Sequence, residues 1–294
     1  ESLNFWLSAG MPYALIEKKR LEKPFNFGDF VGVFYVNNNN DSIKGMVPLS
    51  GGEFFMGTNG KFGFPSDGEG PRRRVKVNPI YVDVCAVSNS QFADFVEGSG
   101  YRTEAEIYGS SFVFSDFIPR RYRGGIGKVV RDAPWWMVVD GAWWREPESR
   151  GSSIDDRMDH PVVHISWNDA VAYSKWSGKR LPTEAEWEFA ARGGHEQHRY
   201  AWGNALTPGG EHMCNIWQGD FPRVNSLDDG FHGTAPARAY EPNDFGLYCM
   251  AGNIWEWCWD RLGPYGEARE ADPTGATSGG VRVLRGGAFG GDPR

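Results

Sequence analysis

The sequence has few cysteines, no long apolar run and no excess of positive charge. Its four cysteines are too widely spaced for a paired-cysteine metal motif, and we expect them to be small buried hydrophobes. No apolar run approaches the ~20 residues of a membrane-spanning helix, so no membrane segment is predicted. A formal net charge of −7 argues against nucleic-acid binding.

Aromatic residues, in contrast, are abundant. They make up 15% of the chain and include 13 Trp, many of which stand beside Gly, Asn or Asp rather than inside apolar runs. Such rings bury a large area and still offer a polar tip, which favours an irregular, loop-rich fold. With 294 residues, 40% of them apolar, the chain can bury a sizeable core.

The composition changes near Gly45. Residues 1–44 combine a weakly helical stretch, an apolar stretch and an Asn-rich turn, and we interpret them as an N-terminal extension. Residues 45–294 are expected to form one domain. In its first part, residues 46–58 predict two short strands around a Ser-Gly-Gly turn. Residues 73–87, with alternating polar and apolar positions, predict a longer strand region.

Three helices are marked by their end signals. Residues 88–98 begin with Ser88 and Gln91, the spacing of a capping box, and end at a glycine. Residues 166–178 and 183–193 carry similar signals, with Glu186 at the capping-box position of the last helix. After Gly194 no period longer than a few residues is found, and bound metal is the obvious way to hold so long an irregular region.

Two loops of this region carry oxygen-bearing side chains suited to Ca²⁺. Residues 215–231 offer Asn215 and the pair Asp228 and Asp229, and residues 251–257 offer Asn253 and Glu256. Calcium takes six to eight oxygen ligands from side chains and carbonyls. Hydrogen-bonded turns without metal explain the same residues equally well.

Other chemistry is weakly supported. His160 and His164 lie in a strand-like segment and are expected to be structural, and the chain has no nucleophile-elbow motif and no phosphate-binding loop. A tryptophan-rich stretch does not fit one buried face, so we expect part of it to line a groove for an extended peptide or a sugar. The predicted groove residues are Trp135, Trp136, Trp143, Trp144 and Arg145.

Several segments resemble the formylglycine-generating enzyme, or sulfatase-modifying factor, family. They include "MVPLSGGEFFMGT", "DHPVVHISWNDAVAYSKWSGKRLPTEAEWEFAARGG" and "FGLYCMAGNIWEW", and the resemblance covers roughly residues 46–290. It implies a single α+β domain related to the C-type lectin fold, with few helices, short antiparallel strands and calcium-bound loops. The implied calcium ligands are Asn215, Ile216, Asp229 and Phe231 in one site, and Gly252, Asn253 and Glu256 in the other.

Members of this family oxidise a sulfatase cysteine to formylglycine with O₂ and a Cu(I) ion held by two cysteines, a ligand set that suits this soft ion. The cysteines lie in a segment of the form R-V-x-x-G-G-S-Y-x-C-x-x-x-x-C. Here "RVLRGGAFGGD" has Ala288 at the serine, Phe289 at the tyrosine and Gly291 at the first cysteine. The second cysteine would fall two residues beyond Arg294.

Two functions follow from this departure. The chain is a copper-dependent oxidase of sulfatases, or it is a non-catalytic paralogue that binds sulfatases or other peptides through the same groove. An oxidase with iron held by His160 and His164 ranks last, because these residues do not make a facial triad. Ser174 and Ala191 replace half-cystines of the family's vertebrate secretory members, which leans towards a bacterial cytoplasmic protein.

Overall fold

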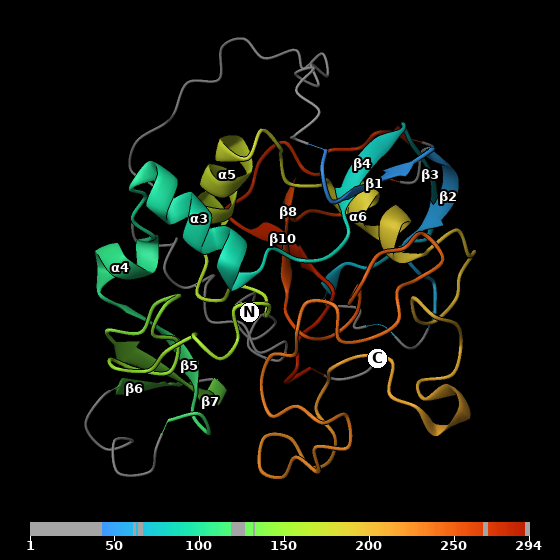
Figure 1. The fold of residues 1–294 in the computed structure, drawn as a ribbon. Helices are drawn as coiled ribbons and strands as arrows, with labels where there is room; N and C mark the ends of the chain where they lie inside the picture. The colour runs from blue at the N-terminus through green and yellow to red at the C-terminus, as the bar shows by residue number, and fades with distance from the viewer. Residues whose placement is uncertain are drawn as a thin grey trace.

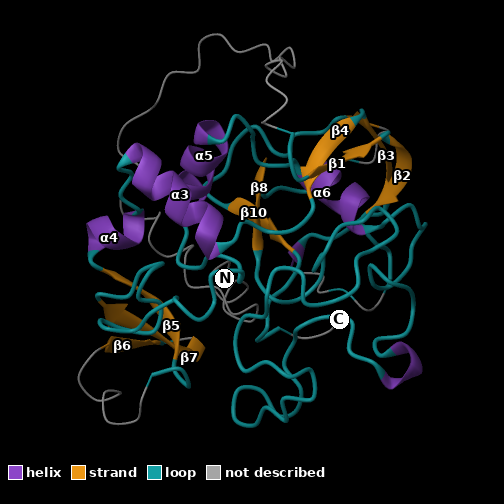
Figure 2. Cartoon of the chain, in the orientation of Figure 1, coloured by secondary structure: helices purple, strands orange, loops and turns teal. Residues whose placement is uncertain are grey.

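The computed structural model describes residues 43–60, 63, 67–118, 127–131, 133–266 and 270–291. The N-terminal extension predicted for residues 1–44 therefore lies almost entirely outside the described residues. Helices and strands are short, and loops occupy much of the chain (Figure 2). This agrees with the predicted α+β class with few helices. No helix in the described ranges is long and apolar enough to cross a membrane.

The described strands form four small sheets rather than one continuous sheet (Figure 1). The strand pairs are β1 (Met46–Leu49) with β4 (Ile80–Asp83), β2 (Gly52–Met56) with β3 (Arg73–Val77), and β8 (Glu256–Arg261) with β10 (Arg282–Arg285). The fourth sheet places β7 (Ala133–Asp140) between β5 (Ser110–Phe114) and β6 (Gly127–Val130). These pairs are antiparallel; β9 (Glu270–Ala271) adds to β3 in parallel.

The strands predicted over residues 46–87 exist, but their pairing is not local. β1 and β2 follow one another in the chain, yet each pairs with a strand from further along. The strand expected over residues 73–87 is divided into β3 and β4 at Pro79, which lacks the N–H needed by a continuous ladder. The segment at residues 160–166 forms only an isolated bridge, between Pro161 and Ser88.

The three predicted helices are confirmed. They are α3 (Asn89–Ser99), α5 (Trp167–Trp176) and α6 (Glu184–Ala191), and each begins with a reciprocal capping box. α3 ends at Gly100, in the left-handed conformation, rather than at Gly98. Sequence reasoning missed α4 (Glu104–Tyr108), although Thr103 and Glu106 form the same capping box there. That helix is too short to show a hydrophobic period.

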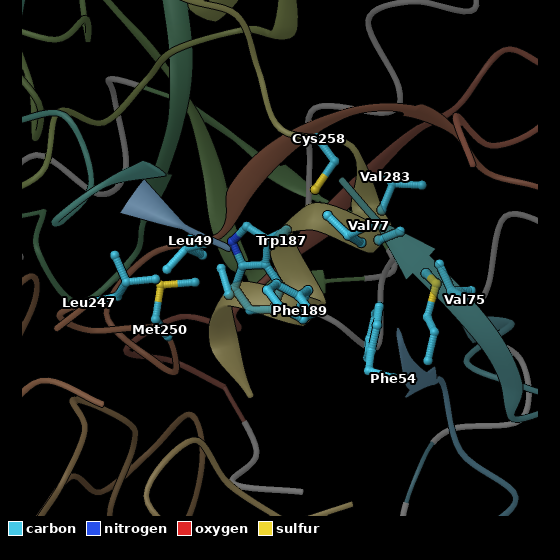
Figure 3. Close-up of a cluster of buried hydrophobic side chains, with 13 residues drawn as sticks. Leu49, Phe54, Val75, Val77, Trp187, Phe189, Leu247, Met250, Cys258 and Val283 are labelled. Atoms are coloured by element: carbon cyan, nitrogen blue, oxygen red, sulfur yellow. The ribbon is translucent and has the colours of Figure 1, made fainter. Parts of the chain in front are cut away.

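Two core clusters hold these elements. The larger one lies where α6 packs against β2 and β3, with the rings of Phe189 and Phe54 5.5 Å apart (Figure 3). The second lies between α3 and α5, where the ring centroids of Phe92 and Trp144 are 5.2 Å apart. Each fully buried ring of this size contributes roughly 1.5–3 kcal/mol, so the two clusters position the short strands around them.

An ion-pair network ties β10 to α6. The buried carboxylate of Glu188 accepts from Arg192 at 2.5 Å, from Arg285 at 2.8 Å and from the Gly57 backbone at 2.8 Å. Burial acts to raise the pKa of Glu188, but the two guanidinium charges lower it overall. Arg285 also pairs with Glu184 at 3.2 Å. This network fixes the strand that leads to residues 286–291.

The region after Gly194 is irregular, as predicted. Between α6 and β8 the structure has only the short 3₁₀ helix η2 (Pro208–Gly210) among the described elements. Side chains hydrogen-bond the backbone in place of ladders: Asn243 accepts from the Phe245 and Leu247 N–H groups and donates to the Ala190 carbonyl. Each such bond satisfies backbone groups that a helix or sheet would otherwise pair.

Candidate functional site

A cleft of about 1450 Å³ runs between β4 and the segment that follows β10. Its walls come from β4, the end of β5, the loop before α5 and the segment at residues 253–257. At one end it reaches Ala288, Phe289 and Gly291, so the position of the family's first cysteine lies on the cleft wall. Small-molecule pockets usually measure about 300–1,000 Å³, and this cleft is larger.

The end of the cleft beside Gly291 is aromatic. Phe114 lies at its centre, and five rings contact it with centroids 5.5–6.1 Å away: Phe117, Trp136, Trp217, Phe221 and Phe289. Four of these rings, those of Phe117, Trp136, Phe221 and Phe289, also line the cleft. Sequence reasoning missed most of this cluster, because its members come from four separate segments and no local pattern links them.

The segment at residues 288–291 forms a tight turn over this cluster. The Gly291 N–H donates to the Ala288 carbonyl at 2.7 Å, and the Phe289 N–H donates to the Asn253 carbonyl at 3.0 Å. A Cβ atom on Gly291 would lie 2.9 Å from the Ala288 oxygen, closer than real side chains approach. A side chain at position 291 would therefore require the Ala288 carbonyl or the backbone of residue 291 to shift.

Among the predicted groove residues, Trp136 lines the cleft. Trp135 is not among the residues of the cleft wall, and its ring packs edge-on against Phe221 with 5.3 Å between centroids. Both tryptophans pack against the small cluster of Phe112, Val130 and Ala133.

Trp143, Trp144 and Arg145 belong to the second core cluster and its rim. Trp144 is fully buried, which corrects its prediction as a groove residue, and Trp143 packs on it with ring centroids 5.8 Å apart. The Arg145 guanidinium lies 4.6 Å from the Trp144 ring centroid and pairs with Glu97 at 3.2 Å. The irregular tryptophan spacing therefore reflects two packing sites, with one tryptophan left at the cleft.

His160 and His164 both line the cleft, and each is hydrogen-bonded to a hydroxyl group. His160 Nδ1 lies 3.0 Å from Thr234 Oγ1, and His164 Nδ1 lies 2.8 Å from Ser111 Oγ. Burial lowers the pKa of His160, and it lowers the pKa of His164 to about 4. His164 also has a φ of 60°, a conformation uncommon outside glycine, so its backbone is held there by the surrounding structure.

The residues predicted for the first calcium site come together in one loop cluster. Asp229 accepts from the Ile216 N–H at 3.1 Å, from Gln218 at 2.8 Å and from the Phe231 N–H at 3.1 Å. Asn215 is 1% exposed; its Nδ2 donates to the Gly233 carbonyl, while its Oδ1 has no hydrogen-bond partner. A buried oxygen without a donor suits a cation.

The second predicted site is arranged differently. The Asn253 side-chain oxygen accepts from Asn215 Nδ2 at 3.1 Å and from the Ala235 N–H at 2.8 Å, so Asn253 joins the first loop. Glu256 accepts from Trp187 Nε1, on α6, at 2.9 Å. Burial raises the pKa of Glu256 to about 7. Gly252 has a φ of 71°, and a Cβ atom there would lie 2.3 Å from the backbone carbonyl oxygen of Asn215.

The four cysteines are free thiols. Cys214 and Cys258 are buried, as expected for small hydrophobes, while Cys85 and Cys249 are partly exposed. Burial raises the pKa of Cys214 to about 12, which keeps this thiol protonated. Within the described ranges, no group of three or more His, Cys, Asp or Glu side chains could hold a metal ion.

Comparison with known proteins gives the same family by sequence model and by individual relatives. The family model described as "Sulfatase-modifying factor enzyme 1-like domain" matches residues 33–294. The formylglycine-generating enzyme of Thermomonospora curvata is 55% identical over 84% of this chain and 82% of its own, and that of Streptomyces coelicolor is 52% identical over 84% and 79%. The inactive Cα-formylglycine-generating enzyme 2 of Bos taurus is 45% identical over 85% and 78%.

Solved structures support the fold. PvdO from Pseudomonas aeruginosa superposes with a TM-score of 0.58 and 22% identity, over 84% of this chain and 83% of its own. This likeness supports the predicted fold class, with its few helices, short strands and relation to the C-type lectin fold.

Proposed function

Because the chain belongs to the sulfatase-modifying factor family, we propose that it binds an extended peptide, from a sulfatase or another protein, in the cleft that ends at Gly291. The carrying observation is the cleft itself: its 1450 Å³ volume and its course from β4 to residues 288–291 suit an extended chain better than a small molecule. The same cleft would deliver a substrate residue to the position where family members hold copper.

We propose further that position 291 does not serve as a copper ligand. Family copper is held by two thiolates, and glycine has no side chain to replace one of them. The turn geometry adds a second reason, since a Cβ at this position would lie 2.9 Å from the Ala288 oxygen. The cysteine-pair chemistry therefore does not fit this turn, and the chain is proposed to be a peptide-binding paralogue.

Calcium, in contrast, fits the first loop. The proposed ligands are Asn215 Oδ1, the Asp229 carboxylate and the carbonyls of Ile216 and Phe231. Support comes from the buried Asn215 side-chain oxygen, which lacks a donor, and from the Asp229 carboxylate, which accepts from the N–H of the next residue, Ile216. Bound calcium would crosslink the irregular region and offset the loop entropy.

A second calcium ion at Glu256 fits less well. Asn253 already accepts two hydrogen bonds, so its side-chain oxygen has little capacity left for a cation. Glu256 remains a half-buried acid that a cation would stabilise, with the Gly252 carbonyl as the other proposed donor.

The test combines binding with mass spectrometry. A labelled Cys-x-Pro-x-Arg peptide is titrated against the full chain, then incubated with it, Cu(I) and O₂; the Thermomonospora curvata enzyme is the positive control. We expect binding of the peptide without any change in its mass, and no stoichiometric uptake of Cu(I) in a chelator-competition titration.

The alternative function is the copper-dependent oxidase itself, which the 55% identity to a protein named formylglycine-generating enzyme favours. Loss of the mass that accompanies conversion of the thiol to an aldehyde would establish this alternative and overturn the non-catalytic proposal. Absence of peptide binding would overturn the assignment of the cleft.

A further inference from the structure

We infer that the end of the cleft at residues 288–291 is a pocket for a bulky apolar side chain of the bound peptide, aromatic or aliphatic, rather than for a cysteine. This inference rests on the proposed peptide binding and names the side chain that the cleft selects. The residues that set the preference are Ala288, Gly290 and Gly291 as a floor, with four aromatic rings as walls.

The floor is small and apolar. Ala288, Gly290 and Gly291 all line the cleft, and none carries a polar side-chain atom. Two of the backbone N–H groups of this turn are also used within the chain: the Gly291 N–H donates to the Ala288 carbonyl, and the Phe289 N–H donates to the Asn253 carbonyl. A ligand hydroxyl or thiol on this floor would lose water without a side-chain donor from Ala288, Gly290 or Gly291 to replace it.

The walls are aromatic rings held in place by one another. Phe117 and Phe289 lie 5.4 Å apart, and both contact Phe114, which is 2% exposed. Trp136 and Phe221 close the other side, each in ring contact with Phe114. Aromatic surfaces fixed in this way accept another ring or an aliphatic side chain with large buried area and little loss of their own freedom.

Two polar residues beside this end, Asp116 and His232, contact each other. His232 Nε2 lies 3.1 Å from Asp116 Oδ2, and the His232 ring packs against Phe117 at 5.2 Å. Asp116 and His232 both line the cleft, and each is about half exposed. This pair therefore places polar, half-exposed groups beside the apolar floor. That arrangement is typical of a pocket for an uncharged anchor residue.

The experiment compares peptides that differ at one residue. Four labelled peptides with Phe, Leu, Cys or Ser at the central position are titrated against the full chain by fluorescence polarisation. We expect the Phe and Leu peptides to bind about tenfold or more tightly than the Cys and Ser peptides, as the difference in buried apolar area predicts.

Two variants assign the preference to this turn. Ala288→Leu fills the floor and is expected to remove the advantage of the Phe peptide over the Ser peptide. A circular-dichroism spectrum and a urea midpoint that match the wild type show that the variant is folded. Ala205→Leu makes the same change at an exposed residue outside the cleft lining and should preserve the wild-type preference.

The outcomes separate this inference from the proposed function. If all four peptides bind equally, if the Cys peptide binds most tightly, or if the preference survives in Ala288→Leu, the apolar pocket is wrong although the cleft binds peptides. If no peptide binds, the proposed function fails and the pocket fails with it.

Discussion

The last described segment of the chain, residues 282–291, has two parts with opposite environments. Arg285 lies beneath α6, paired with the buried carboxylates of Glu184 and Glu188. Three residues later, Ala288 opens a turn of small side chains on the cleft wall. The first part is held by ion pairs between side chains. The second is held by backbone hydrogen bonds at Phe289 and Gly291. A framework of this kind allows the chemistry of the cleft to change while the fold stays the same.

The largest expected effect on stability comes from disrupting the ion-pair network that joins β10 to α6. Glu188→Ala leaves the Arg192 and Arg285 charges without their shared partner, and we expect the free energy of unfolding to fall by about 3–5 kcal/mol. Urea unfolding measures the change. Glu97→Ala, which removes the exposed partner of Arg145, is the control and should change stability by about 1 kcal/mol at most. Equal effects would show that the network does not anchor β10.

Calcium extends the comparison to the irregular region. At a calcium concentration about 100 times the Kd, binding should raise the free energy of unfolding by about 2.7 kcal/mol, and chelator should lower the melting temperature accordingly. Asp229→Asn is expected to abolish this calcium-dependent increment, whereas the neighbouring Asp228→Asn should retain it. An increment that is the same in both variants, or absent from the wild type, would rule out the proposed site.

The pH dependence of the free energy of unfolding tests β8, the strand that pairs with β10. Burial raises the pKa of Asp260, on β8, to about 7, whereas the unfolded chain has a pKa near 3.9. Between these values the unfolded state is ionised and the native state is protonated, so stability falls as pH rises. Between pH 5 and pH 7 we expect a loss of about 2–3 kcal/mol from this group.

The matched variant for this prediction is Asp260→Asn, which keeps an oxygen to accept from the Glu184 N–H. Urea unfolding at pH 5 and pH 7 should show a smaller decline in this variant than in the wild type. An exposed acid, as in Asp220→Asn, should leave the decline unchanged. A decline in Asp260→Asn as large as that of the wild type would contradict the assignment.

The smallest effect distinguishes two adjacent glycines of the cleft turn. A Cβ at Gly291 would meet the Ala288 oxygen at 2.9 Å, whereas one at Gly290 would meet a Phe221 ring carbon at 3.4 Å, an ordinary contact. Gly291→Ala should therefore lower the free energy of unfolding by about 1 kcal/mol, and Gly290→Ala should be neutral or slightly stabilising. Thermal unfolding compares the two. The reverse order would mean that the turn tolerates a side chain at position 291.

Local signals in the sequence predicted much of the fold. Capping residues at Ser88, Ser166 and Thr183 placed three helix starts correctly, because a cap satisfies backbone donors within the same turn. The same signal at Thr103 was present but went unused, since α4 spans too few residues for periodicity to support it.

Candidate site residues were predicted less evenly. Asn215 and Asp229 stand within one loop, and Asp229 accepts from the N–H of Ile216, the residue after Asn215; their binding of calcium stays a prediction. Asn253 was assigned with Glu256 because the two are neighbours in the chain, but its amide reaches back to Asn215. Such a contact depends on how two distant loops pack, and no local pattern records it.

The sequence by itself determined the helix starts, the irregular region after Gly194, the family resemblance and the loss of a thiol at Gly291, because each depends on residue type or short spacing. Only the tertiary structure decided that Trp144 fills the core while Trp136 lines the cleft, and that Phe114, Phe221 and Phe289 meet at its end. The physical reason is that burial and ring contact depend on the packing of segments far apart in the chain.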